Sequence, residues 1–231
     1  LCLRIINGFL YAGTVGDGLF KINLKTLDVT HFTEKEGLGA ASIGYLYIDV
    51  QNNLWLGTLD KGLLKMKGVD KDGKLSIEKR YINSGKAGQI AANDVRAINS
   101  DQKGNLWVAT AAGLSKLLTN NSFKNYYERD GLPSSALYSL LSDSAGNFWM
   151  SSNSGIIRFN PNLPENEIRF KNYRAKDGLV NTEYSTNAYY FSSNGYMCFG
   201  GTMGYNVFRP SQIKDNPNAP QVYIVGYKRG G

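Results

Sequence analysis

The sequence that decides the fold is GNLWVATAAGL, which occupies residues 104–114. Related copies occur at residues 8–14 (GFLYAGT), 53–58 (NLWLGT), 147–152 (NFWMSS) and 195–201 (GYMCFGG). Each copy has a central anchor residue, and a glycine follows that anchor after six or seven positions. The anchors are Tyr11, Trp55, Trp107, Trp149 and Cys198, and the glycines are Gly18, Gly62, Gly113, Gly155 and Gly204. The chain is therefore built from five repeats.

The spacing and the local pattern of the repeats indicate a β-propeller. The anchors are 44, 52, 42 and 49 residues apart, and a period in the forties is typical of helical pairs or of four-stranded propeller blades. Side chains around Trp55 alternate between two faces of a short apolar run bounded by turn residues, which favours strands. We therefore predict an all-β chain made of four-stranded antiparallel blades. One blade is expected at residues 94–99, 105–110, 113–118 and 122–128, and the next begins at residues 136–142.

The anchor residues are predicted to form the core. The second strand of a blade packs against both neighbouring blades, so the three tryptophans are expected between blades and not in contact with a ligand. Cys198 occupies the same position and is expected to be a buried, inert thiol. Two cysteines do not define a disulfide framework. A bridge between Cys2 and Cys198 would require the first and last blades to be neighbours.

Composition and charge exclude several classes of protein. The chain has 231 residues, of which 42% are apolar and only six are proline, as in one sizeable folded domain. Its net charge of +7 comes from lysines scattered over turns and outer strands, so we expect a solvated surface and no nucleic-acid partner. It contains no apolar run of about 18 residues, so any membrane helix is expected outside this chain. Residues 1–9 lack the features of a signal peptide, and the chain is expected to be a piece of a longer protein.

The residues needed for catalysis or for tight metal binding are missing from the sequence. His31 is the only histidine, which argues against a Ser-His-Asp triad and against a multi-histidine metal site. Asp70 and Asp72 begin a run that is similar to a calcium loop, but position 12 of that loop is Tyr81 and not a glutamate. We therefore predict no catalytic residues, no metal site and no cofactor.

The repeats and their linkers resemble the two-component regulator propeller family. The resemblance rests on NLWLGT and its variants, on the following Gly-Leu, and on a linking Asp-Gly-Leu at residues 130–132 and 177–179, with Glu-Gly-Leu at 36–38. Members of this family usually close seven blades, which implies that the five repeats over residues 1–214 are an open fragment. Residues 220–227 (PQVYIVGY) are similar to the first strand of the immunoglobulin-like domain that usually follows. Residues 215–231 are therefore expected to hold a linker and that strand.

The resemblance also implies a function. Such proteins are typically periplasmic sensor regions of hybrid histidine kinases, and many respond to oligosaccharides. This chain is accordingly expected to be a non-catalytic, ligand-sensing segment of a protein that dimerises as a whole. Two alternatives remain open at this point. One is a propeller used only for protein–protein interaction or dimerisation, and the other is an enzyme like the streptogramin lyases.

Propeller topology indicates which face could bind a ligand. In a blade with strands a to d, the b–c loop and the connection to the next blade lie on one face, which we call the linker face. Its connections are longer and more varied than the tight turns on the opposite face, so a binding site is expected there. The candidates at the starts of the first strands are Asn93, Asp94, Arg96, Ser135, Tyr138, Asn181, Glu183 and Tyr184. The alternative is that the two tyrosines fill the space between blades and the polar residues cap turns.

Overall fold

The chain forms five successive antiparallel sheets, which confirms the all-β propeller prediction. A computed structural model describes residues 2–214 apart from residues 70–74, 169 and 181–182. The predicted linker and immunoglobulin-like strand at residues 215–231 lie outside the described residues. In the part of the chain that is described, no helix is long and apolar enough to cross a membrane.

The sheets correspond to the five repeats and follow chain order. Blade 1 consists of β1 (Cys2–Ile6), β2 (Phe9–Gly13), β3 (Leu19–Asn23) and β4 (Val29–Phe32). Blade 2 consists of β5 (Ile43–Ile48), β6 (Leu54–Thr58), β7 (Leu63–Val69) and β8 (Leu75–Tyr81). Blade 3 consists of β9 (Val95–Ser100), β10 (Leu106–Thr110), β11 (Gly113–Leu117) and β12 (Phe123–Tyr126). Blade 4 consists of β13 (Leu141–Ser142), β14 (Phe148–Ser152), β15 (Gly155–Phe159) and β16 (Lys171–Tyr173), and blade 5 of β17 (Tyr184–Phe191), β18 (Met197–Gly201) and β19 (Gly204–Phe208).

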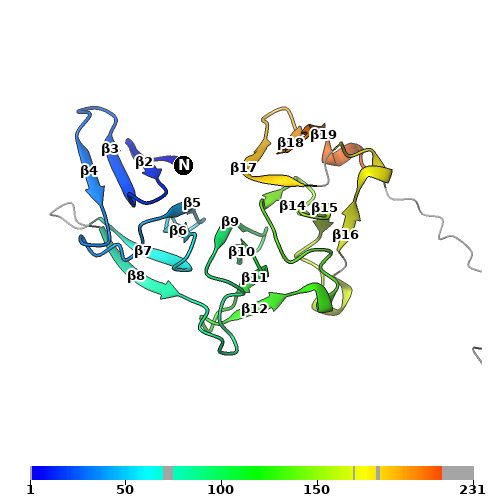
Figure 1. Cartoon of the computed structure of the whole chain (residues 1–231), viewed down its shortest axis with the longest axis horizontal. Coiled ribbons are helices and arrows are strands. Elements are labelled where there is room, and N and C mark those ends of the chain that lie inside the picture. The colour runs from blue at the N-terminus through cyan, green and yellow to red at the C-terminus, as the bar shows by residue number, and fades with distance from the viewer. Residues whose placement is uncertain (1, 70–74, 169, 181–182, 215–231) are drawn as a thin grey trace, which may run out of the picture.

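The blades stand side by side around an open arc. Figure 1 shows blade 1 and blade 5 at the two ends of the arc, with β5, β9 and β17 on its inner side and β4, β8, β12 and β16 on its outer side. Along the inner side, β1 packs against β5, and β5 packs against β9. Blade 5 has three strands within the described residues, so its outer edge is formed by β19.

The first strand of blade 4 is much shorter than predicted. Residues 136–142 were expected to form it, but only Leu141–Ser142 pair regularly, with one isolated bridge between Leu137 and Ser152. The reason is that the Ser139 side chain, and not a backbone carbonyl, accepts a hydrogen bond from the neighbouring strand. The hydroxyl of Ser139 accepts the backbone N–H of Ser151 at 2.7 Å and contacts the Ser151 hydroxyl at 2.8 Å. A side chain that bonds the backbone in this way competes with the regular ladder.

The glycine that opens the third strand is required by close approach of the fourth strand. Gly62, Gly113 and Gly155 have φ values of +77°, +145° and +114°. A Cβ atom on Gly62 would lie 2.1 Å from the carbonyl oxygen of Tyr81, and one on Gly155 would lie 2.0 Å from that of Tyr173. Any other residue would therefore be strained both in its backbone and by this contact.

The tryptophan anchors lie between blades, as predicted. Trp107 is completely buried and contacts Phe148 and Phe159 of blade 4, with ring centroids 5.9 and 5.4 Å apart. Trp149 contacts Phe208 of blade 5 at 5.1 Å. Aromatic pairs at these distances add a specific attraction to the burial of apolar area.

A second role of the repeat is visible only in the structure. In blades 2, 3 and 4, an aspartate six residues before the tryptophan accepts the indole N–H at 2.8, 3.0 and 2.8 Å. The same carboxylate accepts the backbone and side-chain N–H groups of the asparagine in the Asn-Leu-Trp or Asn-Phe-Trp motif. The aspartates are Asp49, Asp101 and Asp143. The repeat thus locks its own turn to the tryptophan through charge-assisted hydrogen bonds.

The prediction that Cys198 is buried is wrong. Cys198 is partly exposed and pairs across the sheet with Tyr190 and Val207, which are 65% and 50% exposed. Within the described residues, no further blade covers this side of blade 5. Cys2 and Cys198 are both free thiols, and burial raises the pKa of the Cys2 thiol to about 11.

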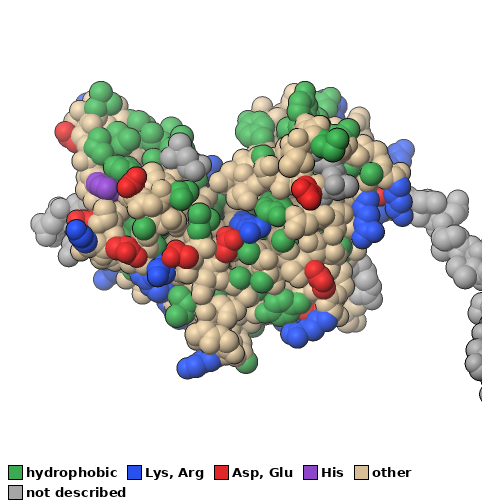
Figure 2. Space-filling view, viewed as in Figure 1, with side chains coloured by type: hydrophobic (Ala, Val, Ile, Leu, Met, Phe, Trp, Pro, Cys, Tyr) green, Lys and Arg blue, Asp and Glu red, His purple; other side chains and the backbone are tan. Residues whose placement is uncertain are grey.

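Figure 2 shows hydrophobic side chains gathered over both end blades of the arc.

Candidate functional site

The connections between blades form compact capped turns on the linker face. In η1 (Glu128–Asp130) the carboxylate of Asp130 accepts the backbone N–H of Tyr127 at 2.9 Å, and Gly131 follows with a φ of +91°. In η3 (Ala175–Asp177), Asp177 accepts the N–H of Arg174 at 2.8 Å, and Gly178 has a φ of +94°. The Asp-Gly-Leu linkers therefore have a structural role, because they fix the path of the chain from one blade to the next.

Three of the predicted residues come together at the linker-face end of the interface between blades 3 and 4. The guanidinium of Arg96 donates to one carboxylate oxygen of Asp94 from Nε at 3.1 Å and from Nη2 at 2.9 Å. It also lies over the ring of Tyr138, 4.7 Å from the centroid. Tyr138 donates its hydroxyl hydrogen to Oδ1 of Asn153 at 2.6 Å. We call these four residues the Arg96 cluster.

The Arg96 cluster contains two polar atoms that lack a partner. Oδ1 of Asp94 and Nη1 of Arg96 are buried, and neither has a hydrogen-bond partner within the described part of the chain. The side chains as wholes are 30% and 19% exposed, so the cluster is at the surface although these atoms are shielded. A buried charged group without a partner costs free energy. Both atoms are shielded from the surface, so a water molecule enclosed beside them would satisfy them.

The other predicted residues do not join this cluster. Asn93 exchanges two hydrogen bonds with the backbone of Asn83, at 2.7 and 3.0 Å, and so braces the linker before blade 3. Ser135 donates its backbone N–H and its hydroxyl to Glu128 at 3.1 and 3.0 Å. Both therefore have structural partners, although both remain near the linker face.

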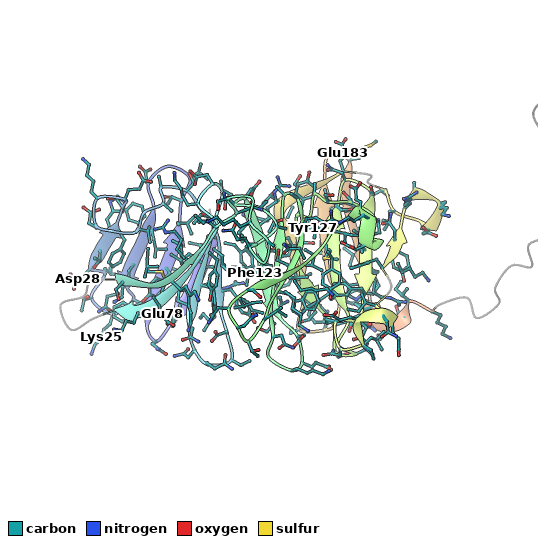
Figure 3. The ribbon with its side chains drawn as sticks, turned by 90° about the horizontal axis from the view of Figure 1, so that it is seen from below. Lys25, Asp28, Glu78, Phe123, Tyr127 and Glu183 are labelled. Atoms are coloured by element: carbon teal, nitrogen blue, oxygen red, sulfur yellow. The ribbon has the colours of Figure 1, made fainter. Side chains whose placement is uncertain are left out.

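The remaining candidates belong to blade 5 and the connection before it. Tyr184 is only 4% exposed and donates its hydroxyl to Asn206 at 3.0 Å, and burial raises the pKa of Tyr184 to about 12. Glu183 is exposed, and Figure 3 shows it at the linker-face edge of the molecule, opposite the edge where Lys25 lies. Asn181 lies outside the described residues.

One member of the cluster was not among the predicted site residues. Asn153 lies in the loop between β14 and β15, directly after the anchor motif of blade 4. This loop is a b–c loop, and the sequence analysis expected such loops on the linker face. Its contact with Tyr138 depends on the register of blade 4, which the sequence does not give.

The described residues offer binding groups and no cluster of metal ligands. Among the residues that the structure describes, no group of three or more His, Cys, Asp or Glu side chains could hold a metal ion. His31 lies far along the chain on outer strand β4, where its ring stacks on Phe20 with centroids 4.0 Å apart. The Arg96 cluster offers hydrogen bonds, one aromatic face and one ion pair, which is the chemistry of a binding site.

Comparison with known proteins agrees with the propeller repeats. The family model described as "Two component regulator propeller" matches residues 89–112. Over 229 residues the chain is 29% identical to histidine kinase P4 of Formosa agariphila. The aligned region covers 96% of this chain and 16% of that protein. The chain therefore spans about one sixth of the length of the curated relative that it matches.

Solved structures support the fold. The extracellular domain of a hybrid two-component system protein from B. thetaiotaomicron superposes with a TM-score of 0.63 at 18% identity, covering 91% of this chain and 33% of that one. A virginiamycin B lyase from Staphylococcus aureus superposes with a TM-score of 0.61 at 12% identity, covering 90% of this chain and 68% of the lyase. At such low identities the likeness concerns the propeller architecture alone.

Proposed function

We propose that this chain, of which residues 89–112 match the two-component regulator propeller model, is part of the extracytoplasmic sensor region of a hybrid two-component histidine kinase, and that its ligand is an oligosaccharide. The parent protein would lie in the inner membrane, with this segment in the periplasm and a membrane helix outside this chain. The segment itself would bind or transmit and would not catalyse. It would act within a homodimer of the parent protein.

The Arg96 cluster carries this proposal. Oligosaccharides present hydroxyl groups and apolar C–H faces, and a binding site for them needs a few well-placed polar groups beside an aromatic surface. The exposed parts of the Asp94 carboxylate and of the Arg96 guanidinium supply an acceptor and donors. Tyr138 supplies an aromatic surface beside them. Because the cluster joins blades 3 and 4, a bound sugar would also bridge two blades.

Calorimetry on the complete extracytoplasmic region with a panel of oligosaccharides tests the proposal. We expect one sugar class to bind, and Arg96→Ala to weaken that binding at least tenfold because it removes a charged hydrogen-bond donor, a loss of about 1.5–3 kcal/mol. Lys176→Ala is the matched control, since it removes one positive charge from an exposed position on the same face. Absence of binding to every oligosaccharide, together with a response to another class of solute, would refute the ligand class.

A second candidate function is protein–protein association through the end blades. Its support is the exposure of large apolar side chains there, with Ile5 at 66% in blade 1 and Tyr205 at 70% in blade 5. Such surfaces often mark interaction sites. Sedimentation velocity over a range of concentrations, with and without sugar, separates the two functions. Ligand-independent dimers that need Ile5 and Tyr205 would favour association.

A further inference from the structure

A hollow lies between blades 2 and 3, on the face opposite the linker face. It has a volume of about 360 Å³ and is lined by Trp55 and Tyr81 of blade 2 and by Leu106 and Leu117 of blade 3. The tight turn that contains Asn121 borders it. We call this hollow the notch. Its volume falls in the range of small-molecule sites, about 300–1,000 Å³.

The notch is open because two side chains are smaller than their counterparts in the next interface. Between blades 3 and 4, Phe148 and Phe159 occupy the positions that correspond to Leu106 and Leu117, and both rings contact Trp107. Phe148 and Phe159 are 0% and 2% exposed. The equivalent space is therefore filled by aromatic rings at one interface and filled only in part, by smaller leucine side chains, at the other.

The loops also differ, because a long connection covers the interface between blades 3 and 4 whereas only a short turn borders the notch. Blade 4 joins β15 to β16 by a long connection that contains η2 (Glu165–Glu167), and this connection reaches back to blade 3. Lys124 contacts Glu165 at 2.6 Å, and Lys103 donates to the carbonyl of Asn162 at 3.3 Å. Blade 3 joins β11 to β12 by a tight turn, from which Asn121 accepts the Tyr81 hydroxyl hydrogen at 2.9 Å. The short turn leaves the notch accessible.

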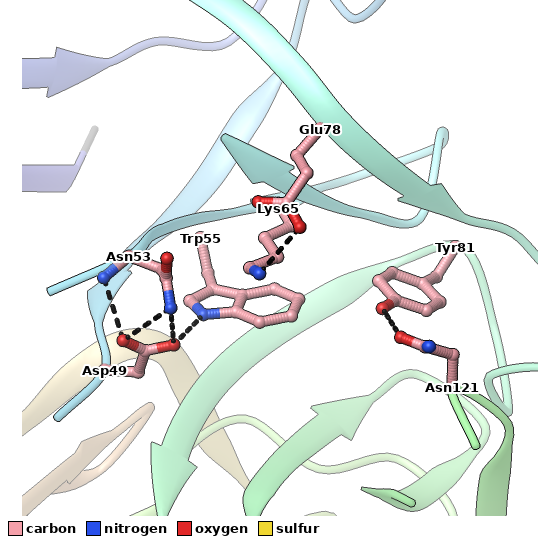
Figure 4. Close-up of polar contacts among 7 residues, drawn as sticks. All are labelled: Asp49, Asn53, Trp55, Lys65, Glu78, Tyr81 and Asn121. Carbon is pink, nitrogen blue, oxygen red and sulfur yellow. Dashed lines mark hydrogen bonds and ion pairs between the residues drawn. The ribbon is translucent and has the colours of Figure 1, made fainter. Parts of the chain in front are cut away.

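The walls of the notch combine aromatic rings with hydrogen-bonding groups. Trp55 and Tyr81 are 6.1 Å apart between centroids and inclined by 26°. Figure 4 shows them in a row, with Asp49 beside Trp55, Asn121 beside Tyr81, and the Lys65–Glu78 pair next to the indole. The pair is 2.8 Å apart and its side chains are 22% and 44% exposed. A ligand in the notch would therefore meet apolar, donor and acceptor groups within one small volume.

We propose that the notch binds one neutral sugar ring. Leu117 and the narrow exposed edges of Trp55 and Tyr81, which are 4% and 7% exposed, would contact the C–H groups of the sugar. The carboxylate of Glu78 would accept its hydroxyl hydrogens, while Lys65 and the Asn121 amide would donate. Because Lys65 is paired with Glu78 and Asp49 carries a further negative charge, the site disfavours an anionic sugar. The proposal rests on the proposed function for the class of ligand, but it places that ligand on the opposite face.

The test measures binding of the methyl glycosides of D-glucose, D-galactose and D-mannose to the complete extracytoplasmic region by calorimetry. Leu117→Phe introduces the ring that the next interface carries at the same position, and we expect it to weaken binding at least tenfold by filling the notch. Phe159→Leu is the reverse exchange between blades 3 and 4, and it should leave the affinity within about twofold. Asn121→Gly keeps the positive φ of 64° accessible and should weaken binding about three- to tenfold by removing hydrogen bonds.

The outcomes separate the notch from the Arg96 cluster. Loss of glycoside binding in Leu117→Phe and in Asn121→Gly, with Arg96→Ala unchanged, supports the notch. Binding that survives both notch substitutions but is lost in Arg96→Ala overturns the notch and leaves the proposed function intact. If none of the three glycosides binds, the proposal that the notch binds a sugar is overturned. The proposed function is then decided separately, by whether the same protein binds an oligosaccharide. Tighter binding of D-glucuronate than of the D-glucose glycoside overturns the neutral-sugar assignment.

Discussion

Two neighbouring interfaces share the same repeat motif but are packed differently. One lies between blades 3 and 4, and the other lies between blades 2 and 3. Both begin with an aspartate that holds a tryptophan, and both place a tyrosine of the fourth strand beside that tryptophan. Between blades 3 and 4, Phe148 and Phe159 complete a closed aromatic core. Between blades 2 and 3, leucines at those positions leave a hollow of about 360 Å³.

The comparison shows that a repeat can specify the fold and still leave room for a site. The features shared by the two interfaces are the turn, the aspartate and the tryptophan, which position the strands. The features that differ are two side chains and one loop length. A difference of two aromatic rings therefore separates a structural interface from a candidate binding site, without any change in topology.

The largest expected effect comes from truncating the two tryptophans. Trp107→Ala should lower the free energy of unfolding by about 4 kcal/mol, because it opens a cavity in a closed core. Trp55→Ala should cost about 3 kcal/mol, at the lower end for a buried tryptophan, since Trp55 borders a hollow. Urea unfolding of each variant, followed by far-ultraviolet circular dichroism, measures the difference. Equal losses would show that the two interfaces are packed alike.

A smaller effect is expected from the aspartates that hold the tryptophans. Asp101 is only 7% exposed, and its replacement by alanine would leave the buried indole N–H of Trp107 without its acceptor. We expect Asp101→Ala to cost about 3 kcal/mol and Asp49→Ala, at a more exposed position, about 1 kcal/mol. The same unfolding experiment provides the measurement. A larger loss for Asp49 than for Asp101 would contradict the ranking by burial.

The smallest effect concerns the two tyrosines. The Tyr81 hydroxyl bonds to Asn121, whereas the buried Tyr126 hydroxyl has no partner among the described residues. We therefore expect Tyr81→Phe to cost about 1 kcal/mol and Tyr126→Phe to change stability at neutral pH by about 0.5 kcal/mol or less.

The buried hydroxyl of Tyr126 predicts that the free energy of unfolding depends on pH. Burial, helped by Glu165 and Asp130, raises the pKa of Tyr126 to about 12, above its value in the unfolded chain. The folded state therefore retains the proton where the unfolded state has lost it, and stability should fall as pH rises from about 10 towards 12. Tyr126→Phe should flatten this fall. An unfolding free energy that declines equally steeply in the variant would show that Tyr126 is not its cause.

Much of the fold followed from the repeat. Five copies at a period in the forties, with alternating apolar residues, were sufficient to predict propeller blades, and the three tryptophans lie between blades as expected. The recurring glycines were visible in the sequence, and the structure shows that those opening the third strands combine a positive φ with a close backbone. The sequence failed at residues 136–142, where Ser139 bonds the neighbouring strand, and at Cys198, whose side of blade 5 is uncovered.

The site was harder to predict because it depends on contacts between repeats. Asp94, Arg96 and Tyr138 were all named from their place at the linker face, and the structure brings them together. Asn153 completes that cluster through a contact across blade 4 that no spacing in the sequence reveals. Whether any of these residues binds a ligand remains a prediction.

The sequence by itself determined the number of repeats and the strand order within each blade, because these depend on local spacing and backbone geometry. Only the tertiary structure decided which interfaces are full and which are open. That outcome depends on the volumes that side chains from different blades contribute to one shared space, with Phe148 and Phe159 filling one interface and Leu106 and Leu117 leaving a notch in the other. How densely an interface is packed depends on residues that are far apart in the chain, and the sequence alone does not show which of them meet.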